Sequence, residues 1–155
     1  MIKFELTDVD FKIIALLQRD ARVRMETLAM ETGTSVATVQ RRIRELRRKG
    51  VIIGDVTVIA PEAAGFAMTF FIMVELERES IYQLDEFRRK MKAEPRVQQC
   101  YYITGDADFA VIALARDMQD FQELTQCLFF DDPNIKRFRT SVVMERTKVG
   151  ISVPI

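Results

Sequence analysis

The sequence of 155 residues contains no histidine and only two cysteines, Cys100 and Cys127. Without histidine the chain cannot build Ser-His or Cys-His nucleophile systems or any metal site that uses imidazole. Two cysteines cannot supply a structural zinc cage, and in a reducing compartment we expect them to be core or near-core thiols. Any catalysis would have to use carboxylate or lysine side chains alone. We therefore expect no enzyme, no catalytic residues, no metal and no cofactor.

The sequence also lacks the G-x-x-x-x-G-K-[ST] and G-x-G-x-x-G motifs that cradle nucleotide phosphates. Its longest near-continuous apolar run, residues 66–74, is too short to cross a bilayer. Lys3 and Glu5 interrupt the start of the chain, and no apolar segment of a signal peptide follows them. We expect a cytoplasmic protein that has no membrane partner.

Charged residues are abundant, but they are divided unevenly along the chain. Residues 1–60 carry 11 Lys+Arg against 8 Asp+Glu, whereas residues 61–155 carry 12 against 15. A basic part joined to an acidic part predicts two domains with different tasks, and we place their boundary at residue 60.

The stretch 34–50, TSVATVQRRIRELRRKG, has the composition of an amphipathic helix with one strongly basic face. Its apolar residues recur every three or four positions, as on one face of a helix. From Arg41 to Lys49, six basic residues stand against one acid. Taken alone, such a charged face is explained equally well as a solvated surface.

Two shorter helices are predicted before this stretch. The first begins after Thr7 and ends near Asp20, and the second covers residues 25–32 and ends at Gly33. A turn of two or three residues then forces a steep crossing, which is the helix-turn-helix arrangement. With a basic face on the third helix only, the pattern predicts binding in the major groove of double-stranded DNA, and a helix-turn-helix that binds only protein is the alternative. Residues 51–58 are predicted as β structure, either a wing or a linker strand.

Short polar side chains near the start of the third helix suit contacts with base edges, and arginines suit guanine or phosphate. We expect base or near-base contacts from Thr38, Gln40 and Arg41, and phosphate contacts from Arg42, Arg44, Arg48 and Lys49. Ser35, at the N-terminal end of the helix, completes the predicted DNA-binding set.

A strand–helix–strand pattern occurs twice in the second part of the chain. The expected strands are 66–76, 97–104, 109–115 and 135–144, and the helices begin at Ser80 and Asp117. This duplication predicts a ferredoxin-like βαββαβ domain, and with the N-terminal helices the fold class is α+β. One face of the sheet would be open and apolar, which predicts at least a dimer. The residues expected to point towards that face are Phe70, Ile72, Val111 and Val143.

The two middle strands are joined by Thr104-Gly-Asp-Ala-Asp108. Local sequence alone favours an ordinary hairpin turn over a ligand site, and too few oxygen ligands are suitably spaced for calcium. The functional alternative is a loop whose N–H groups hold a carboxylate while Asp106 or Asp108 holds an ammonium group. A free α-amino acid carries both groups.

A series of residues in the first part of the chain forms a recognisable pattern: Leu6-x-x-x-Asp10-x-x-Ile13-Ile14-x-x-Leu17, Asp20-Ala21-Arg22, Leu28-Ala29, Gly33, Ser35-x-x-Thr38-Val39-x-Arg41-Arg42-Ile43-x-x-Leu46 and Gly50-Val51-Ile52. The second part adds Thr104-Gly105-Asp106-x-Asp108. With these residues in this order, the chain resembles the leucine-responsive/asparagine-type (Lrp/AsnC) family of transcriptional regulators over nearly its whole length, and the Thr104–Asp108 segment resembles the effector loop of that family.

The resemblance implies a winged helix-turn-helix domain, a ferredoxin-like sensing domain, and dimers that assemble into tetramers or octamers. It implies an amino-acid effector and control of genes for amino-acid metabolism or transport. A ligand-independent architectural or protein-interaction oligomer is the alternative. Phe109 stands where the family often has tyrosine, which would alter the polarity of the pocket. The effector-binding residues that the resemblance implies are Tyr102, Thr104, Gly105, Asp106, Asp108 and Thr140.

Overall fold

The structure, a computed structural model, describes residues 5–155 and divides them into two compact units. Residues 5–58 and the tail Val149–Ile155 form the N-terminal unit, and Ile59–Lys148 form the second unit. The predicted boundary at residue 60 lies close to this division, but nothing in the local sequence of residues 149–155 predicts that the tail belongs to the first unit. Within residues 5–155, no helix has both the length and the apolar character that a membrane span requires.

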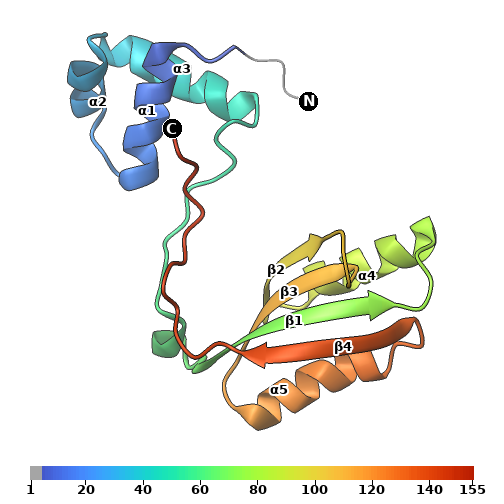
Figure 1. Ribbon diagram of the computed structural model, residues 1–155. Helices are drawn as coiled ribbons and strands as arrows, with labels where there is room; N and C mark the ends of the chain where they lie inside the picture. The colour runs from blue at the N-terminus through green and yellow to red at the C-terminus, as the bar shows by residue number, and fades with distance from the viewer. Residues whose placement is uncertain (1–4) are drawn as a thin grey trace. The chain divides into compact units, whose positions relative to one another are not determined.

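The N-terminal unit contains three helices: α1 (Asp8–Arg19), α2 (Met25–Thr32) and α3 (Val36–Arg48) (Figure 1). Thr7 caps α1 in a reciprocal capping box with Asp10, and the Ser35 hydroxyl accepts the backbone N–H of Thr38 at the start of α3. Gly33 ends α2 in the left-handed region, at φ 66°, and gives the sharp turn between α2 and α3. The helices enclose a core of Ile13, Leu28, Ala29, Val39, Ile43 and Leu46. The predicted helix-turn-helix is confirmed.

Residues 51–58 form no strand, so the β structure predicted for them, a wing or a linker strand, is wrong. Ile53, Val56 and Val58 lie exposed along the segment. β-Branched residues favour extended backbone, but a strand also needs a neighbour that pairs with its N–H and C=O groups. None of the described residues supplies that neighbour.

The C-terminal tail is attached to α1 by a pair of hydrogen bonds. The Gln18 side-chain amide donates to the carbonyl of Val153 at 3.0 Å, and the N–H of Val153 donates to the Gln18 side-chain oxygen at 2.7 Å. This two-point contact joins a helix near the start of the chain to a backbone segment near its end.

The second unit is a four-stranded antiparallel sheet with two helices and the predicted βαββαβ order. Its strands are β1 (Met68–Leu76), β2 (Val97–Tyr102), β3 (Phe109–Ala115) and β4 (Ile135–Val142), arranged in space as β2-β3-β1-β4. A short 3-10 turn, η1 (Pro61–Ala64), precedes β1. The helices are α4 (Ile81–Ala93) and α5 (Met118–Thr125), and α5 continues as a π-helical turn, η2 (Gln126–Phe130).

Both helices cover the same face of the sheet, where the core of the unit lies (Figure 1). The ring of Phe70 stacks on that of Phe121 from α5, with centroids 3.7 Å apart. Ile72 and Val111 are fully buried in the same cluster. The prediction that Phe70, Ile72 and Val111 point to the open face is therefore wrong. Residues on both sides of β1 and β3 are apolar, so alternation alone did not reveal which set faces the helices.

The open face carries the residues that alternate with this core set. Phe71 pairs with Ile112 across β1 and β3, and Thr69 pairs with Leu114. Phe71 is 40% exposed although it lies in the middle of a central strand. The face is therefore apolar, as the sequence predicts, but it is built from the other set of side chains. Val143 follows the end of β4 and is half-buried.

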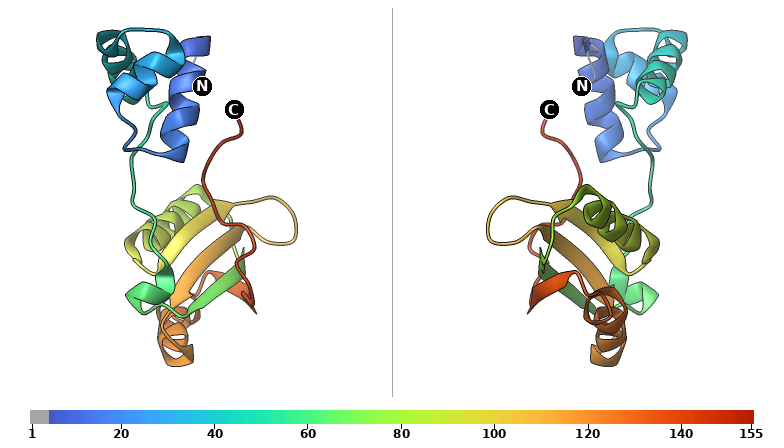
Figure 2. Two further views of the ribbon diagram at one scale, coloured as in Figure 1. Left: turned by 90° about the vertical axis from the view of Figure 1, so that its left-hand side faces the viewer. Right: turned by 90° about the vertical axis from the view of Figure 1, so that its right-hand side faces the viewer.

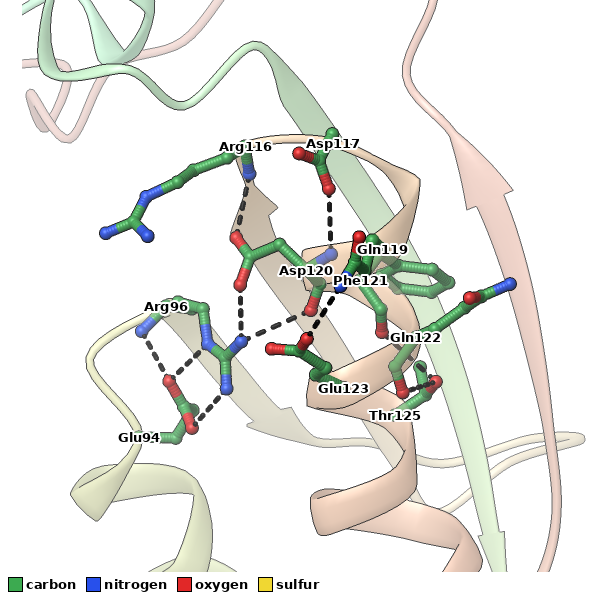
Figure 3. A network of polar contacts seen from close by, with 10 residues as sticks. All are labelled: Glu94, Arg96, Arg116, Asp117, Gln119, Asp120, Phe121, Gln122, Glu123 and Thr125. Atoms are coloured by element: carbon green, nitrogen blue, oxygen red, sulfur yellow. Dashed lines mark hydrogen bonds and ion pairs between the residues drawn. The ribbon is translucent and has the colours of Figure 1, made fainter.

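A network of charged side chains fastens the end of α4 to the start of α5 (Figure 3). The guanidinium of Arg96 contacts the carboxylate of Glu94 at 2.8 Å and that of Asp120 at 2.6 Å. Asp120 also accepts the backbone N–H of Arg116 at 2.8 Å. The hydrogen bond from Arg96 lowers the pKa of Glu94, and the backbone hydrogen bond from Arg116 lowers the pKa of Asp120, with Arg96 adding to it. The ionised form of the network is therefore stabilised by the fold.

The two cysteines differ in environment. Cys100 is half-buried against the core of the sheet, and burial raises the pKa of its thiol to about 11. Cys127 lies exposed in η2, so the prediction that both thiols are core or near-core is wrong for Cys127.

Candidate functional site

The outer face of α3 carries an exposed polar and basic surface. Gln40, Arg41, Arg44 and Arg48 are exposed, whereas Val39, Ile43 and Leu46 are buried on the opposite side. Within residues 5–155 the guanidinium of Arg41 makes no hydrogen bond or ion pair. All five donor groups of this guanidinium are thus available to a partner outside the domain.

Arg42, predicted to contact phosphate, instead faces the interior of the N-terminal unit. Its guanidinium forms a two-point ion pair with the carboxylate of Asp10 and also donates to the Thr7 hydroxyl at 3.1 Å. The side chain of Asp10 is 1% exposed and that of Arg42 is 19% exposed. On a helix with 100° between residues, position 42 lies nearer the buried stripe than position 41 does. This placement favours a role for Arg42 in holding α3 on α1.

The Asp10 carboxylate is ionised at this buried position because its partners compensate for the loss of water. Burial alone would raise the pKa of Asp10, but hydrogen bonds from Arg42 and Thr7 outweigh that effect and leave the pKa lowered. Asp10 therefore has two functions, since it closes the cap of α1 and anchors Arg42 of α3.

The remaining predicted DNA-binding residues lie on or beside the exposed face. Ser35 and Thr38 share a hydrogen bond between their hydroxyls at 2.9 Å, so both side chains sit at the N-terminal end of α3. Arg48 is 72% exposed and only 3.9 Å from the carboxylate of Glu45, a loose contact in water. Arg47, which is not among the predicted DNA-binding residues, is also exposed and contacts Asp55 at 2.5 Å.

A second candidate site is a cavity of about 460 Å³ at one end of the sheet, beside the connection between β2 and β3. That connection, residues 103–108, projects from the sheet as an open loop (Figure 2). Gly105 adopts φ 117°, which a residue with a side chain rarely tolerates. Most of the lining residues are charged: Glu75, Glu79, Asp106, Asp108, Lys136, Arg137 and Arg139, together with Leu76, Gly105 and Ala107.

Asp108 anchors this loop to the neighbouring strand. Its N–H donates to the carbonyl of Val74 at 2.9 Å, and its carboxylate accepts the N–H of Leu76 at 2.6 Å. Its carbonyl accepts the N–H of Ile103 and closes the base of the loop at 2.8 Å. One oxygen of the carboxylate is thus engaged in holding the loop. Asp106 is exposed at the loop tip and has no partner among residues 5–155.

The opposite wall of the cavity is formed by β1 and β4. A bulge between Glu75 and Leu76 interrupts the pairing, and as a result Lys136 and Arg137 both reach Glu75. The ammonium of Lys136 lies 2.5 Å from one oxygen of the Glu75 carboxylate, and Arg137 lies 2.6 Å from the other. The hydrogen bond from Lys136 lowers the pKa of Glu75, and that from Arg137 adds to it.

The other predicted effector residues lie outside this cavity. Tyr102 is on the helix side of the sheet, where its ring contacts Phe109 and its hydroxyl donates to Glu79 at 2.8 Å. Because Glu79 lines the cavity, Tyr102 can orient one of the lining carboxylates without lining it. Thr104 belongs to the loop but not to the lining. Thr140 pairs with Ile72, whose side chain faces the helices, so Thr140 lies on the face opposite to Arg139.

Sequence reasoning missed five charged residues of the lining: Glu75, Glu79, Lys136, Arg137 and Arg139. The alternation of Arg137 and Arg139 along β4 could have placed them on one face. Only the pairing of β4 with β1, with its bulge, brings Lys136 to the same carboxylate. Within residues 5–155, no group of three or more Cys, Asp or Glu side chains could hold a metal ion.

Comparison with known proteins assigns both units. The family described as the winged helix-turn-helix DNA-binding domain matches residues 6–53, and the Lrp/AsnC ligand binding domain matches residues 69–153. An uncharacterised HTH-type transcriptional regulator of Sinorhizobium fredii is 40% identical over 97% of this chain and 89% of that protein.

Two solved structures share the fold. An AsnC family transcriptional regulator from Agrobacterium tumefaciens has a TM-score of 0.89 at 24% identity, covering 96% of this chain and 97% of that one. A transcriptional regulator from Neisseria meningitidis, in complex with L-methionine, has a TM-score of 0.88 at 23% identity and covers 97% of both chains. With the family matches covering both units, the chain belongs to the Lrp/AsnC family of DNA-binding transcriptional regulators.

Proposed function

We propose that α3 reads DNA through Thr38, Gln40 and Arg41, and that Arg44, Arg48 and Lys49 hold phosphates beside these base contacts. The unengaged guanidinium of Arg41 is the observation that carries this assignment. Arg binds guanine through two donors at once, which demands a guanidinium free of other partners. Arg42 is reassigned from phosphate contact to positioning, because it is held by Asp10.

We also propose that the protein acts as a homo-oligomer built on the open face of the sheet. Phe71, Ile112 and Met73 leave apolar surface on a side that no helix covers. Contiguous apolar surface of this kind is typical of a subunit interface. A dimer would present two copies of α3 to successive major grooves, roughly 34–36 Å apart.

The proposed effector is a free α-amino acid, bound in the cavity beside the 103–108 loop. The cavity offers both signs of charge within one small space, as a zwitterion requires. Backbone N–H groups of the loop would hold the α-carboxylate, and Asp106, which has no partner in the described chain, would hold the α-ammonium. The L-methionine bound to the Neisseria meningitidis regulator supports this class of ligand.

The effector would change regulation by favouring one assembly of subunits over another. A ligand shifts such an equilibrium only by its difference in affinity between the two states. Different assemblies present α3 at different spacings, and thus select different DNA arrangements among genes of amino-acid metabolism or transport.

A thermal-shift screen against the twenty amino acids tests the sensing function. A ligand at about 100 times its dissociation constant adds roughly 2.7 kcal/mol to the stability of the unit that binds it. We expect a response to a few amino acids that disappears in Asp106→Ala and persists in Asp131→Ala, an exposed carboxylate outside the cavity. No response to any amino acid would overturn the sensor and leave an architectural regulator, the second candidate function.

Selection of duplexes from a random pool tests the DNA assignment separately. The wild-type protein should enrich a sequence with two half-sites, and Arg41→Ala should lose preference at one base in each half-site. Enrichment of no sequence by the wild-type protein would favour a helix-turn-helix that binds protein.

A further inference from the structure

The wall of the cavity formed by β1 and β4 has more positive charge than its single carboxylate, Glu75, can balance. Lys136 and Arg137 share the single carboxylate of Glu75. Arg139 lines the same cavity, and its guanidinium contacts no partner within residues 5–155. This wall therefore bears three cations against one anion, and one of the cations is unengaged.

The other carboxylates of the lining already accept hydrogen bonds or are needed for the α-ammonium group of the ligand. Asp108 is bonded to the N–H of Leu76, and Glu79 accepts the hydroxyl of Tyr102. Asp106 is the carboxylate left to receive the α-ammonium. An effector whose α-carboxylate and α-ammonium groups are held at the loop would direct its side chain across the cavity towards β4.

Apolar side chains find little to contact in this cavity. Leu76 and Ala107 are its aliphatic lining residues, and both are about 5% exposed. A leucine or methionine side chain would have to displace water from charged groups without replacing the lost hydrogen bonds, which is unfavourable. A side-chain carboxylate would instead make charge-assisted hydrogen bonds with a guanidinium, the strongest class of hydrogen bond available.

We propose that the effector is an acidic amino acid, aspartate or glutamate, and that Arg139 recognises its side-chain carboxylate. The inference rests on the proposed sensing function of the same cavity. Lys136 and Arg137 both contact Glu75, and the two cations leave this wall with a net positive charge. Because Glu75 already engages Arg137, Arg139 is the guanidinium of the wall that can bind the effector. The effector would thus carry a net negative charge, unlike the methionine bound to the Neisseria meningitidis regulator.

Isothermal titration calorimetry on the full chain tests the inference with matched ligand pairs. L-Glutamate and L-glutamine differ by one charged group at nearly equal size, as do L-aspartate and L-asparagine. We expect one acid to bind at least about tenfold more tightly than its amide. L-Leucine and L-methionine should bind more weakly than that acid.

Variants separate this inference from the sensing function on which it depends. Arg139→Gln removes the charge at similar length and should abolish the preference for acid over amide while residual binding of both remains. Arg89→Gln removes an exposed arginine of α4 outside the cavity and should keep the preference. Asp106→Asn should weaken acid and amide by the same factor, because it acts on the α-ammonium.

The outcomes are distinct. Amide bound as tightly as acid, tighter binding of leucine or methionine, or a preference that persists in Arg139→Gln would each overturn the inference and leave the sensor standing. Binding of no amino acid at all would overturn the sensing function and this inference with it.

Discussion

The outer face of α3 and the cavity beside the 103–108 loop are both rich in charged side chains, but the charges are arranged differently. On α3 the exposed groups are of one sign, and Arg41 has no partner within residues 5–155. The cavity is lined by both cations and anions, and Lys136 and Arg137 each form an ion pair with Glu75. A surface of one sign suits a polyanion, whose charges repeat along its length. A cavity of both signs suits a small zwitterion.

The adjacent residues Arg41 and Arg42 show the same difference within one turn of helix. Arg42 is bonded to Asp10 and Thr7, whereas Arg41 is exposed. Identical side chains thus make an internal ion pair at one position and point to solvent at the next, depending on their angle around the helix axis.

The largest effect is expected on breaking the ion pair that holds α3. Asp10→Asn leaves the Arg42 guanidinium partly buried without its anion and should destabilise the N-terminal unit by about 3 kcal/mol. Asp8→Asn, an exposed carboxylate in the same first turn, is the control and should cost much less. Urea unfolding followed by circular dichroism measures both. Equal losses for the two variants would contradict the structural role of the pair.

Substitution of Arg41, the proposed base-contacting residue, should have little effect on stability and a clear effect on specificity. Arg41→Ala should weaken binding to the selected DNA by about 1–3 kcal/mol and change binding to random DNA much less. Arg48→Ala and Lys49→Ala should weaken binding to both DNAs alike, because phosphates carry no sequence information. Fluorescence anisotropy on the two duplexes measures this, and equal losses for Arg41→Ala on both would remove its base-reading role.

Sequence reasoning predicted the elements well because the signals for helices and caps are local. The cap at Thr7, the turn at Gly33 and the βαββαβ order all follow from residues close together in the chain. The failures involve long-range pairing. Sequence alone could not show that Phe71 rather than Phe70 faces away from the helices, because both strand faces are apolar.

The two candidate sites show the same difference between local signals and long-range pairing. The basic face of α3 lies on one helix, so periodicity predicted the exposed positions of Arg41, Arg44 and Arg48. It did not select the exposed Arg47, and it included Arg42, which contacts Asp10 instead. The cavity draws on three separate segments, and the sequence identified only the loop. Glu75 and Lys136 are 61 positions apart, and their contact depends on strand pairing and a bulge. Thr140 was chosen by resemblance, and the register places it on the other face.

The Arg96 network allows a test of charge used purely for folding. The pKa values of Glu94 and Asp120 are lowered in the folded protein, so their contribution is present above the unfolded pKa values, near 4, and is lost as pH falls through the folded values. Arg96→Gln should cost about 2 kcal/mol at pH 7, and this difference from wild type should shrink at pH 3. Unfolding free energies at the two pH values measure it. A difference that is independent of pH would show that packing of Arg96, rather than its charge, is what matters.

A change in salt concentration should have the smallest effect on effector binding in the cavity. The same change should weaken DNA binding by α3 strongly, so it separates the two regions most clearly. DNA binding by a dimer with about six phosphate contacts should weaken on the order of a thousandfold between 50 and 200 mM salt, because each contact releases counterions. Arg48→Ala should reduce the slope by about one contact for each copy of α3. Effector binding should change by less than about threefold over the same range, because its charges pair at short distance in a confined space, where mobile ions screen them little. Calorimetry of the effector and anisotropy of the DNA in the same buffers provide the comparison. A steep salt dependence for the effector would mean that it binds an open charged surface instead of the cavity, and would move the sensing site away from the 103–108 loop.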